Sequence, residues 1–179
     1  LWGGNPEQVV MILHGLGSNG KSSFVGALQS ALGDYARQVA PTSLMANRYG
    51  SAGGPRADLV RLYRVRLAIA VESGEGDTLD EGLLKAVSGS DRINARALYA
   101  KDELEFTPEF LLLLATNNKP VIRGTDYAIW RRLILIPFER TFQEGERDRH
   151  LVEHLASEQT GILGWMIEGC LDWRANGLD

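Results

Sequence analysis

The stretch Gly15-Leu16-Gly17-Ser18-Asn19-Gly20-Lys21-Ser22 decides how the rest of the chain is interpreted, because it fits the pattern G-x-x-x-x-G-K-[ST] without a gap. A wholly apolar run, Val9–Leu13, precedes it, and helical spacing follows it over Lys21–Leu32. Glycines let a backbone wrap around a phosphate with its N–H groups pointing inward, and the start of a helix adds a positive dipole. The sequence therefore predicts a buried strand, a phosphate-binding loop and a helix, in that order.

The residue types in this loop also predict the ligand. Lys21 is placed to reach the β- and γ-phosphates of a nucleotide, and the Ser22 hydroxyl is placed to ligate Mg²⁺. We therefore expect ATP and Mg²⁺ as the bound groups. The residues expected to contact the nucleotide are Gly15, Gly17, Ser18, Asn19, Gly20, Lys21, Ser22 and Ser23. His14, just before the loop, is expected to be a packing or capping residue.

Polar side chains follow two further apolar runs. Glu72 comes directly after Leu67–Val71 and is the candidate acid for the metal's water shell and the attacking water. A second acid is missing at the preceding position. Asn117 follows Leu111–Ala115 and is expected to touch the γ-phosphate or the attacking water. The alternative for Asn117 is a residue of a turn that leaves the sheet.

Further runs extend the pattern to an α/β fold with a parallel sheet covered on both sides. Leu133–Ile136 predicts a fourth buried strand, and Asp80 predicts the N-cap of a helix that ends near Gly89. Ile93–Tyr99 and Leu104–Thr107 predict a hairpin with its tip at 100–103. We expect residues 1–142 to form the core and residues 143–179 to form a helical segment packed on it.

Composition and charge exclude several classes of protein. The 179 residues carry a net charge of −4 and one cysteine, which excludes binding by bulk positive charge and an internal disulfide. The longest apolar run, Phe110–Ala115, is far too short to cross a membrane. Between Arg37 and Arg66 there are six arginines and one acid, which suggests a face that meets an anion or a solvated surface. Because the chain begins at Leu1, we expect it to be a piece of a longer protein.

Arg131 and Arg132 stand directly before the fourth strand. An arginine that reaches a neighbouring subunit's γ-phosphate stabilises charge in the transition state and raises the rate by about 10³–10⁵. No second basic group reaches the loop from within the core motifs. We therefore expect the active site to lie between subunits.

Five segments in order carry a resemblance to one family: GLGSNGKS, LAIAVE, KAVSGSDRINARALY, FTPEFLLLLATNNKP and GTDYAIWRRLILIPF. Over residues 1–142 the chain resembles the ATPase domain of superfamily 3 helicases, in particular the C-terminal part of phage and plasmid primase-helicases and their poxvirus-type relatives. The resemblance implies a P-loop NTPase fold (AAA+-like) with an inserted hairpin. It implies that Lys21 and Ser22 are the Walker A pair, Glu72 the Walker B acid and Asn117 the sensor. It also implies that Arg132, with Arg131 as a close rival, is the finger. Val71 departs from the family, since many relatives carry a second acid there.

The same resemblance implies partners. A hairpin within residues 85–110 would project into the channel of a hexameric ring and grip single-stranded DNA. Lys101 would contact a phosphate, Tyr99 would stack on a base, and Arg96 is a weaker candidate. For Lys101, a solvated turn lysine is an equal alternative. A primase fused to or acting with the domain and a cytoplasmic location would follow, with no role for a membrane.

Two other interpretations stay open. A small-molecule P-loop kinase would have a similar opening motif, with Arg131 and Arg132 as lid residues, although a lid arginine normally sits in a mobile loop. A nucleotide-binding DNA-assembly module with weak hydrolysis would explain the missing second acid.

Overall fold

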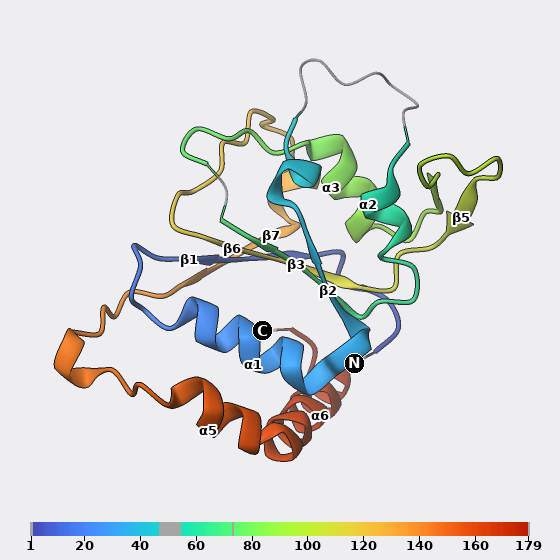
Figure 1. Cartoon of the computed structure of the whole chain (residues 1–179). Helices are drawn as coiled ribbons and strands as arrows, with labels where there is room; N and C mark the ends of the chain where they lie inside the picture. The colour runs from blue at the N-terminus through green and yellow to red at the C-terminus, as the bar shows by residue number, and fades with distance from the viewer. Residues whose placement is uncertain (1, 47–54, 73, 179) are drawn as a thin grey trace.

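The computed structural model describes residues 2–46, 55–72 and 74–178. Its centre is a five-stranded, wholly parallel sheet with the strand order β2-β3-β6-β1-β7 (Figure 1). The strands are β1 Val10–His14, β2 Ala36–Val39, β3 Leu67–Val71, β6 Leu111–Thr116 and β7 Leu133–Pro137. The strands predicted from apolar runs are present, within a residue of their expected ends. The fold is that of a P-loop NTPase, as expected.

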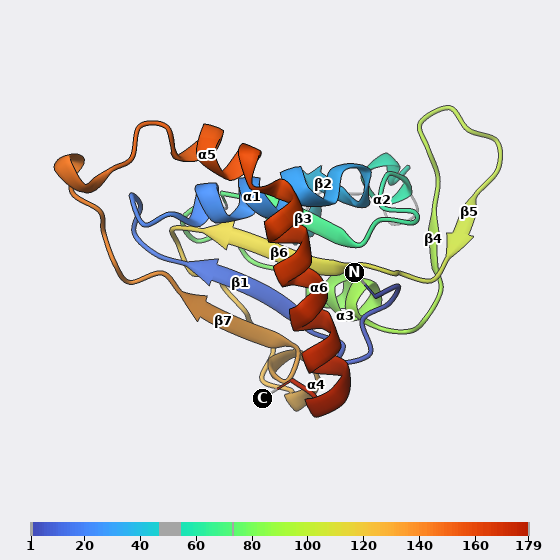
Figure 2. The same ribbon diagram turned by 90° about the horizontal axis from the view of Figure 1, so that it is seen from below.

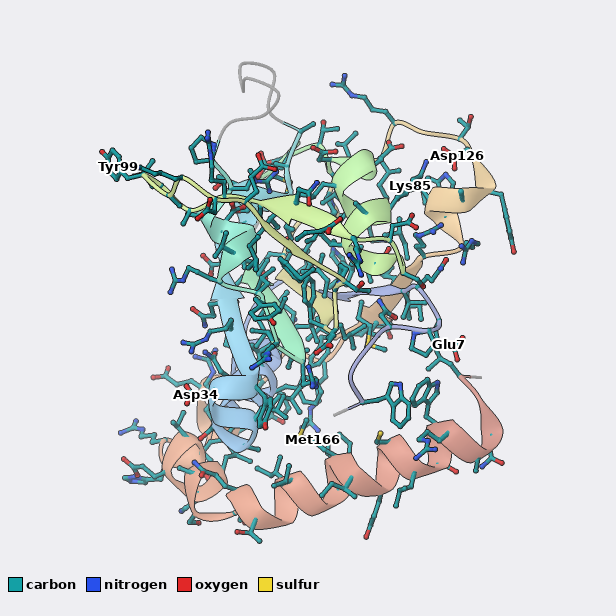
Figure 3. The ribbon with its side chains drawn as sticks, turned by 90° about the vertical axis from the view of Figure 1, so that its right-hand side faces the viewer. Glu7, Asp34, Lys85, Tyr99, Asp126 and Met166 are labelled. Atoms are coloured by element: carbon teal, nitrogen blue, oxygen red, sulfur yellow. The ribbon has the colours of Figure 1, made fainter. Side chains whose placement is uncertain are left out.

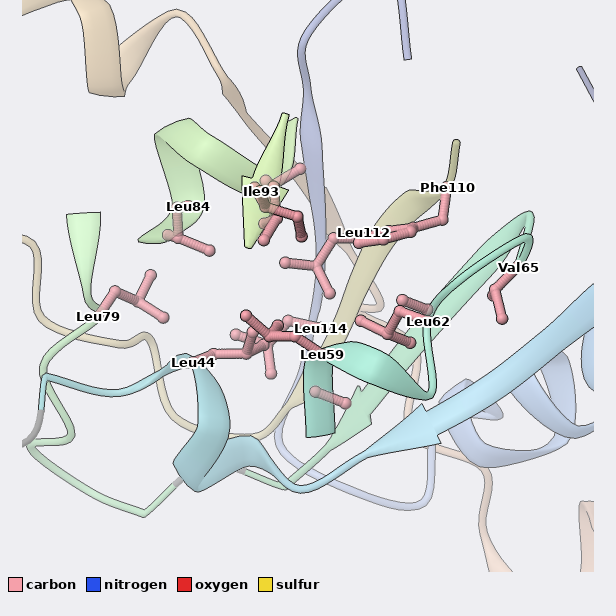
Figure 4. Packing of buried hydrophobic residues seen from close by; sticks show 14 of the residues in the cluster. Leu44, Leu59, Leu62, Val65, Leu79, Leu84, Ile93, Phe110, Leu112 and Leu114 are labelled. Atoms are coloured by element: carbon pink, nitrogen blue, oxygen red, sulfur yellow. The ribbon is translucent and has the colours of Figure 1, made fainter. Parts of the chain in front are cut away.

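The sheet is apolar on both faces because successive strand residues point to opposite sides. Leu112 and Leu114 of β6 pack in one core cluster, while Leu113 and Ala115 pack in the other. The first cluster also takes in Leu84 and Phe110 and is shown in Figure 4. This two-sided burial is the physical reason why the central strands read as continuous apolar runs rather than alternating ones.

Helices cover the two faces unequally. α1 (Lys21–Leu32), α5 (Leu151–Ser157) and α6 (Gln159–Asn176) lie on one face, and α2 (Ala57–Val60) and α3 (Glu81–Ser88) lie on the other (Figures 1 and 2). The short α4 (Tyr127–Trp130) precedes β7. The predicted cap of α3 is confirmed, since the Asp80 side chain accepts the Leu83 N–H at 2.9 Å.

The C-terminal helices pack mainly on α1, and Figure 3 shows α6 running along the base of the molecule. α6 is tied to the start of the chain, where Trp173 Nε1 donates to Glu7 Oε1 at 3.1 Å and Arg174 lies over the Trp2 ring. The division of the chain at residue 142 stays a prediction. Within the described ranges, no helix combines the length and apolar character that crossing a membrane requires.

A separate two-stranded hairpin, β4 (Ile93–Ala95) and β5 (Leu104–Phe106), projects away from the sheet (Figure 2). The hairpin was predicted, but its strands are shorter than expected, and residues 96–103 connect them. Ile93, Ala95 and Phe106 anchor it in the first core cluster. The short strand β2 was not predicted. The small and turn-forming residues of Thr42–Pro55 predict a loop or a short helix; the structure has a 3₁₀ turn at Pro41–Leu44, and residues 47–54 of this segment lie outside the described residues.

Candidate functional site

The candidate site lies where the carboxyl ends of β1, β3 and β6 meet. Because all strands of the sheet are parallel, the residues that follow them gather at the same edge. A cavity of about 310 Å³ opens there. Its lining comes from the loop and the start of α1 (Gly17, Ser18, Asn19, Gly20, Lys21, Ser22 and Ser23), from the end of β3 (Val71 and Glu72) and from the end of β6 (Ala115, Thr116 and Asn117). The structure thus brings together the predicted loop, acid and amide.

The backbone of the loop has the conformation that its glycines permit. Gly17 and Gly20 have φ angles of +100° and +84°, and Ser18 between them has φ +48°. At Gly15 close packing is the reason for a glycine, because a Cβ there would collide with the Asn19 side chain and with the Phe138 carbonyl. The loop is therefore a turn that wraps around a hollow, followed by the exposed N–H groups at the start of α1.

Lys21 is the buried cation of the site. The residue is only 6% exposed. Its Nζ donates to the Gly15 carbonyl at 2.5 Å and to the side-chain oxygens of Asn19 at 3.0 Å and Asn117 at 2.9 Å. Burial lowers the pKa of this ammonium from its ordinary value. All three acceptors are neutral, so within the described part of the chain no carboxylate balances the charge. A nearby anion would stabilise a buried positive charge of this kind.

Glu72 and Ser22 face the same cavity and are both exposed to solvent. Glu72 directly follows β3, has a left-handed φ of +63° and donates its backbone N–H to the Ala115 carbonyl at 2.8 Å. A carboxylate and a hydroxyl on one cavity are oxygen ligands of the kind that Mg²⁺ prefers. Val71, which directly precedes Glu72, also lines the cavity, so no second acid stands at this position.

The tip of the hairpin stands well away from this cavity. Tyr99 is 94% exposed with φ +63°, and Figure 3 shows it at the end of the projecting loop. Lys101 is also exposed, whereas Arg96 is half-buried and its carbonyl accepts the Arg56 N–H at 3.0 Å. The structure therefore presents Tyr99 and Lys101 together at the tip, and Arg96 nearer the base.

Arg131 and Arg132 lie at the end of the sheet opposite to the loop, where the parallel strands begin. They precede β7, whose far end pairs with His14 immediately before the loop. Their guanidinium groups share one acceptor, Gln8 Oε1, at 2.5 Å from Arg131 and 3.0 Å from Arg132. Arg132 also donates to the Ala128 carbonyl at 2.6 Å, and its Nε is buried without a partner among the described residues. Neither arginine reaches the cavity of its own chain.

The sequence is similar to those of viral proteins that are named as helicases and primases. It is 36% identical to the Putative helicase 022R of Frog virus 3 over 143 residues, which covers 78% of this chain and 15% of that protein. It is 34% identical to the Putative helicase L207/L206 of Acanthamoeba polyphaga mimivirus, covering 99% of this chain and 20% of that protein. The Putative primase C962R of African swine fever virus is 27% identical over 73% of this chain and 13% of its own length. No family model matches the chain.

The fold is similar to a solved structure with which the chain shares little sequence. The apo structure of the NrS-1 C-terminal region superposes with a TM-score of 0.65 at 16% identity, over 88% of this chain and 36% of that one. The chain is a domain of the superfamily 3 primase-helicase type. It spans about a fifth or less of the length of the viral relatives it matches.

One residue at the site of this primase-helicase-type domain was missed by sequence reasoning. Arg147 comes from the segment after β7 and donates from Nη2 to Ser18 Oγ at 3.0 Å. The core motifs predict no second basic group at the loop, and Arg147 lies outside those motifs. No local pattern could have found the contact, because it joins residues 129 positions apart and depends on the path that the chain takes back over the loop.

Proposed function

We propose that this domain binds ATP with Mg²⁺ in the cavity beside Lys21 and hydrolyses it. The observation that carries the proposal is the buried Lys21 ammonium, held by neutral oxygens from the loop and from Asn117 in a cavity that Glu72 also lines. A triphosphate in this cavity would give the ammonium its missing counter-charge, and the loop N–H groups would bind the remaining phosphate oxygens. Ser22 and Glu72 would hold the metal, which when bound neutralises charge on the β- and γ-phosphates.

The remaining polar groups define the chemistry on the γ-phosphate. Glu72 is the group that would orient the attacking water, since it is exposed and lines the cavity directly after β3. Asn117 has one oxygen on Lys21, and its amide N–H groups remain to bind the γ-phosphate or the water. Hydrolysis here needs little covalent chemistry, because catalysis of phosphoryl transfer is mostly positioning and electrostatic stabilisation.

We further propose that the domain acts in a ring and that Arg131 or Arg132 completes the site of an adjacent copy. Both arginines lie at the end of the sheet away from their own cavity, directly before β7, which is an outer strand of the sheet. Gln8 holds both guanidinium groups together at this edge. A hexamer, as the resemblance implies, would place this edge against a neighbour's loop.

The proposed task of the ring is to move along single-stranded DNA as part of a replication helicase associated with a primase. The projecting hairpin, with Lys101 and Tyr99 exposed at its tip, supports a DNA contact, because a cation binds phosphate and an aromatic ring stacks on bases. The names of the viral relatives, helicase and primase, agree with this task.

The test is ATP turnover by the purified chain with and without single-stranded DNA, at protein concentrations that span assembly. We expect turnover to require Mg²⁺, to rise with DNA, and to disappear in Glu72→Gln while ATP binding persists. Turnover that ignores DNA but rises with a small phosphate acceptor would favour a kinase instead. ATP binding with negligible turnover under every condition would favour a DNA-assembly module.

A further inference from the structure

The segment that leaves β7 returns across the phosphate-binding loop. We call residues 138–147 the strap. The Phe142 N–H donates to the Ser18 carbonyl at 2.7 Å, and Arg147 donates from Nε to the Phe142 carbonyl at 3.2 Å and from Nη2 to Ser18 Oγ at 3.0 Å. The strap and the loop are thus joined through both the backbone and the side chain of Ser18, a residue that lines the cavity.

Contacts within the strap hold Arg147 in this position. Glu146 accepts the Gln143 N–H at 2.9 Å and the Arg140 guanidinium at 3.2 Å. The Gln143 N–H and then Arg140 hold the pKa of the Glu146 carboxyl below its usual value, so the carboxylate stays ionised at neutral pH. Arg140 also lies over the Phe142 ring, 4.6 Å from its centroid. These contacts hold the strap in a defined conformation, in which Arg147, the residue after Glu146, contacts the loop.

Arg147, like Lys21, has no carboxylate partner among the described residues, but unlike Lys21 it is exposed to solvent. Its two acceptors, the Phe142 carbonyl and the Ser18 hydroxyl, are neutral, and among the described residues it forms no ion pair. A guanidinium has five N–H donors, and these contacts use two of them. The remaining donors are free for a planar, two-pronged interaction with phosphate oxygens, which is the geometry that favours arginine over lysine.

We propose that Arg147 is a second phosphate-binding cation of the nucleotide site, supplied by the same chain. The inference rests on the proposed ATP binding and adds a residue that would hold the γ-phosphate together with Lys21. Arg147 does not line the cavity itself; its guanidinium rests on Ser18, which does. Arg147 binds the nucleotide from the side of the strap. Arg131 or Arg132 of a neighbouring copy would be a separate cation that reaches the same phosphates.

The alternative role for Arg147 is a latch that only keeps the strap on the loop. The number of phosphates on the ligand separates the two roles. A latch shapes the loop that holds the phosphates which ATP and ADP share, so its loss would weaken ATP and ADP by the same factor. A ligand of the γ-phosphate acts on ATP and not on ADP.

The experiment measures dissociation constants for ATP, ADP and AMP, each with Mg²⁺, in the unmodified chain, Arg147→Ala, Arg147→Lys and Arg149→Ala. Arg149 is the matched control, because it is an exposed arginine two residues further on with no contact to the loop among the described residues. We expect Arg147→Ala to weaken ATP by about 10- to 100-fold, and ADP and AMP by less than about twofold, since hydrogen bonds to charged groups have this strength. Arg147→Lys should lie between, and Arg149→Ala should bind like the unmodified chain.

Equal weakening of ATP and ADP, or no weakening of ATP, in Arg147→Ala would overturn the inference. A melting curve of each variant without nucleotide shows whether it is folded, and Arg147→Lys replaces Arg147→Ala if the latter is not. An unmodified chain that binds none of the nucleotides would remove the proposed function and this inference together. An unmodified chain that binds ATP through Lys21, with Arg147→Ala unchanged, would remove the inference alone.

Discussion

The Nζ of Lys21 lies 2.9 Å from the Oδ1 of Asn117, so the residue that begins α1 touches the residue that follows β6. The two are 96 positions apart in the chain. A phosphate bound in the cavity would compete with Asn117 for the same ammonium. The hydrogen bond between Lys21 and Asn117 would therefore change when the loop binds a phosphate. The end of β6 and the phosphate-binding loop are thus coupled through one hydrogen bond.

The first prediction concerns this amide. Asn117→Ala removes one of three acceptors from Lys21 and removes the amide that faces the reacting phosphate. We expect kcat for ATP to fall about 100-fold, the usual cost of losing one stabilising donor in a transition state, with the dissociation constant for ATP changed much less. Asn118→Ala is the matched control. A fall in affinity as large as the fall in kcat would place Asn117 in ground-state binding only.

The second prediction concerns the packing of the loop. Gly15→Ala places a Cβ against the Phe138 carbonyl, which is backbone and cannot rotate away. We expect the free energy of unfolding to fall by about 1–3 kcal/mol, in the range of overpacked sites, and ATP binding to weaken. Gly26→Ala, where a Cβ meets nothing within 4 Å inside α1, should instead stabilise by about 0.5–1 kcal/mol. Equal effects of the two substitutions in urea unfolding would contradict the packing argument.

The third prediction tests the arginines at the far edge of the sheet. If one of them completes a neighbour's site, Arg131→Ala or Arg132→Ala should reduce turnover by about 10³-fold or more and leave ATP binding nearly intact. Mixing that variant with Lys21→Ala should restore some activity, because mixed rings contain sites with both an intact loop and an intact arginine. Arg123→Ala is an exposed control. Mixing without any recovery would argue against action across a subunit boundary.

The fourth prediction concerns the hairpin tip. Lys101→Ala should weaken single-stranded DNA binding and reduce the slope of log affinity against log salt by about 0.7, the contribution of one phosphate contact. Lys119→Ala removes an exposed lysine beyond the end of β6, at the opposite edge of the sheet from the hairpin, and should leave the slope unchanged. The measurement is a fluorescence titration at several salt concentrations. An unchanged slope in Lys101→Ala would move the DNA contact elsewhere.

The elements that could be predicted from the sequence are those that local chemistry specifies. β3 and β6 are buried on both faces, so their residues are apolar without interruption, and the loop's glycines and Lys21 belong to one continuous motif. β2 escaped prediction because it is an edge strand whose Arg37 and Gln38 point to solvent, which removes the apolar signal. For the site, Glu72 and Asn117 were predictable as residues at the ends of parallel strands.

Arg147 could not be predicted for a different reason. Its contact with Ser18 depends on Phe142 and Glu146 holding the strap in one path, and no periodicity in the sequence records that path. The positions of Arg131 and Arg132 were predictable, but their shared acceptor, Gln8, was not, because it comes from the opposite end of the chain.

The most direct test of the account is a calorimetric titration of Mg-ATP into the unmodified chain and into Lys21→Met, with a melting curve of each protein. The side chain of Met has a similar length but no charge, so it removes the cation that would bind the triphosphate and also removes the cost of burying that cation. The account predicts one ATP bound per chain and loss of binding in Lys21→Met, with melting curves that show both proteins to be folded. ATP binding of equal strength in the two proteins would contradict it.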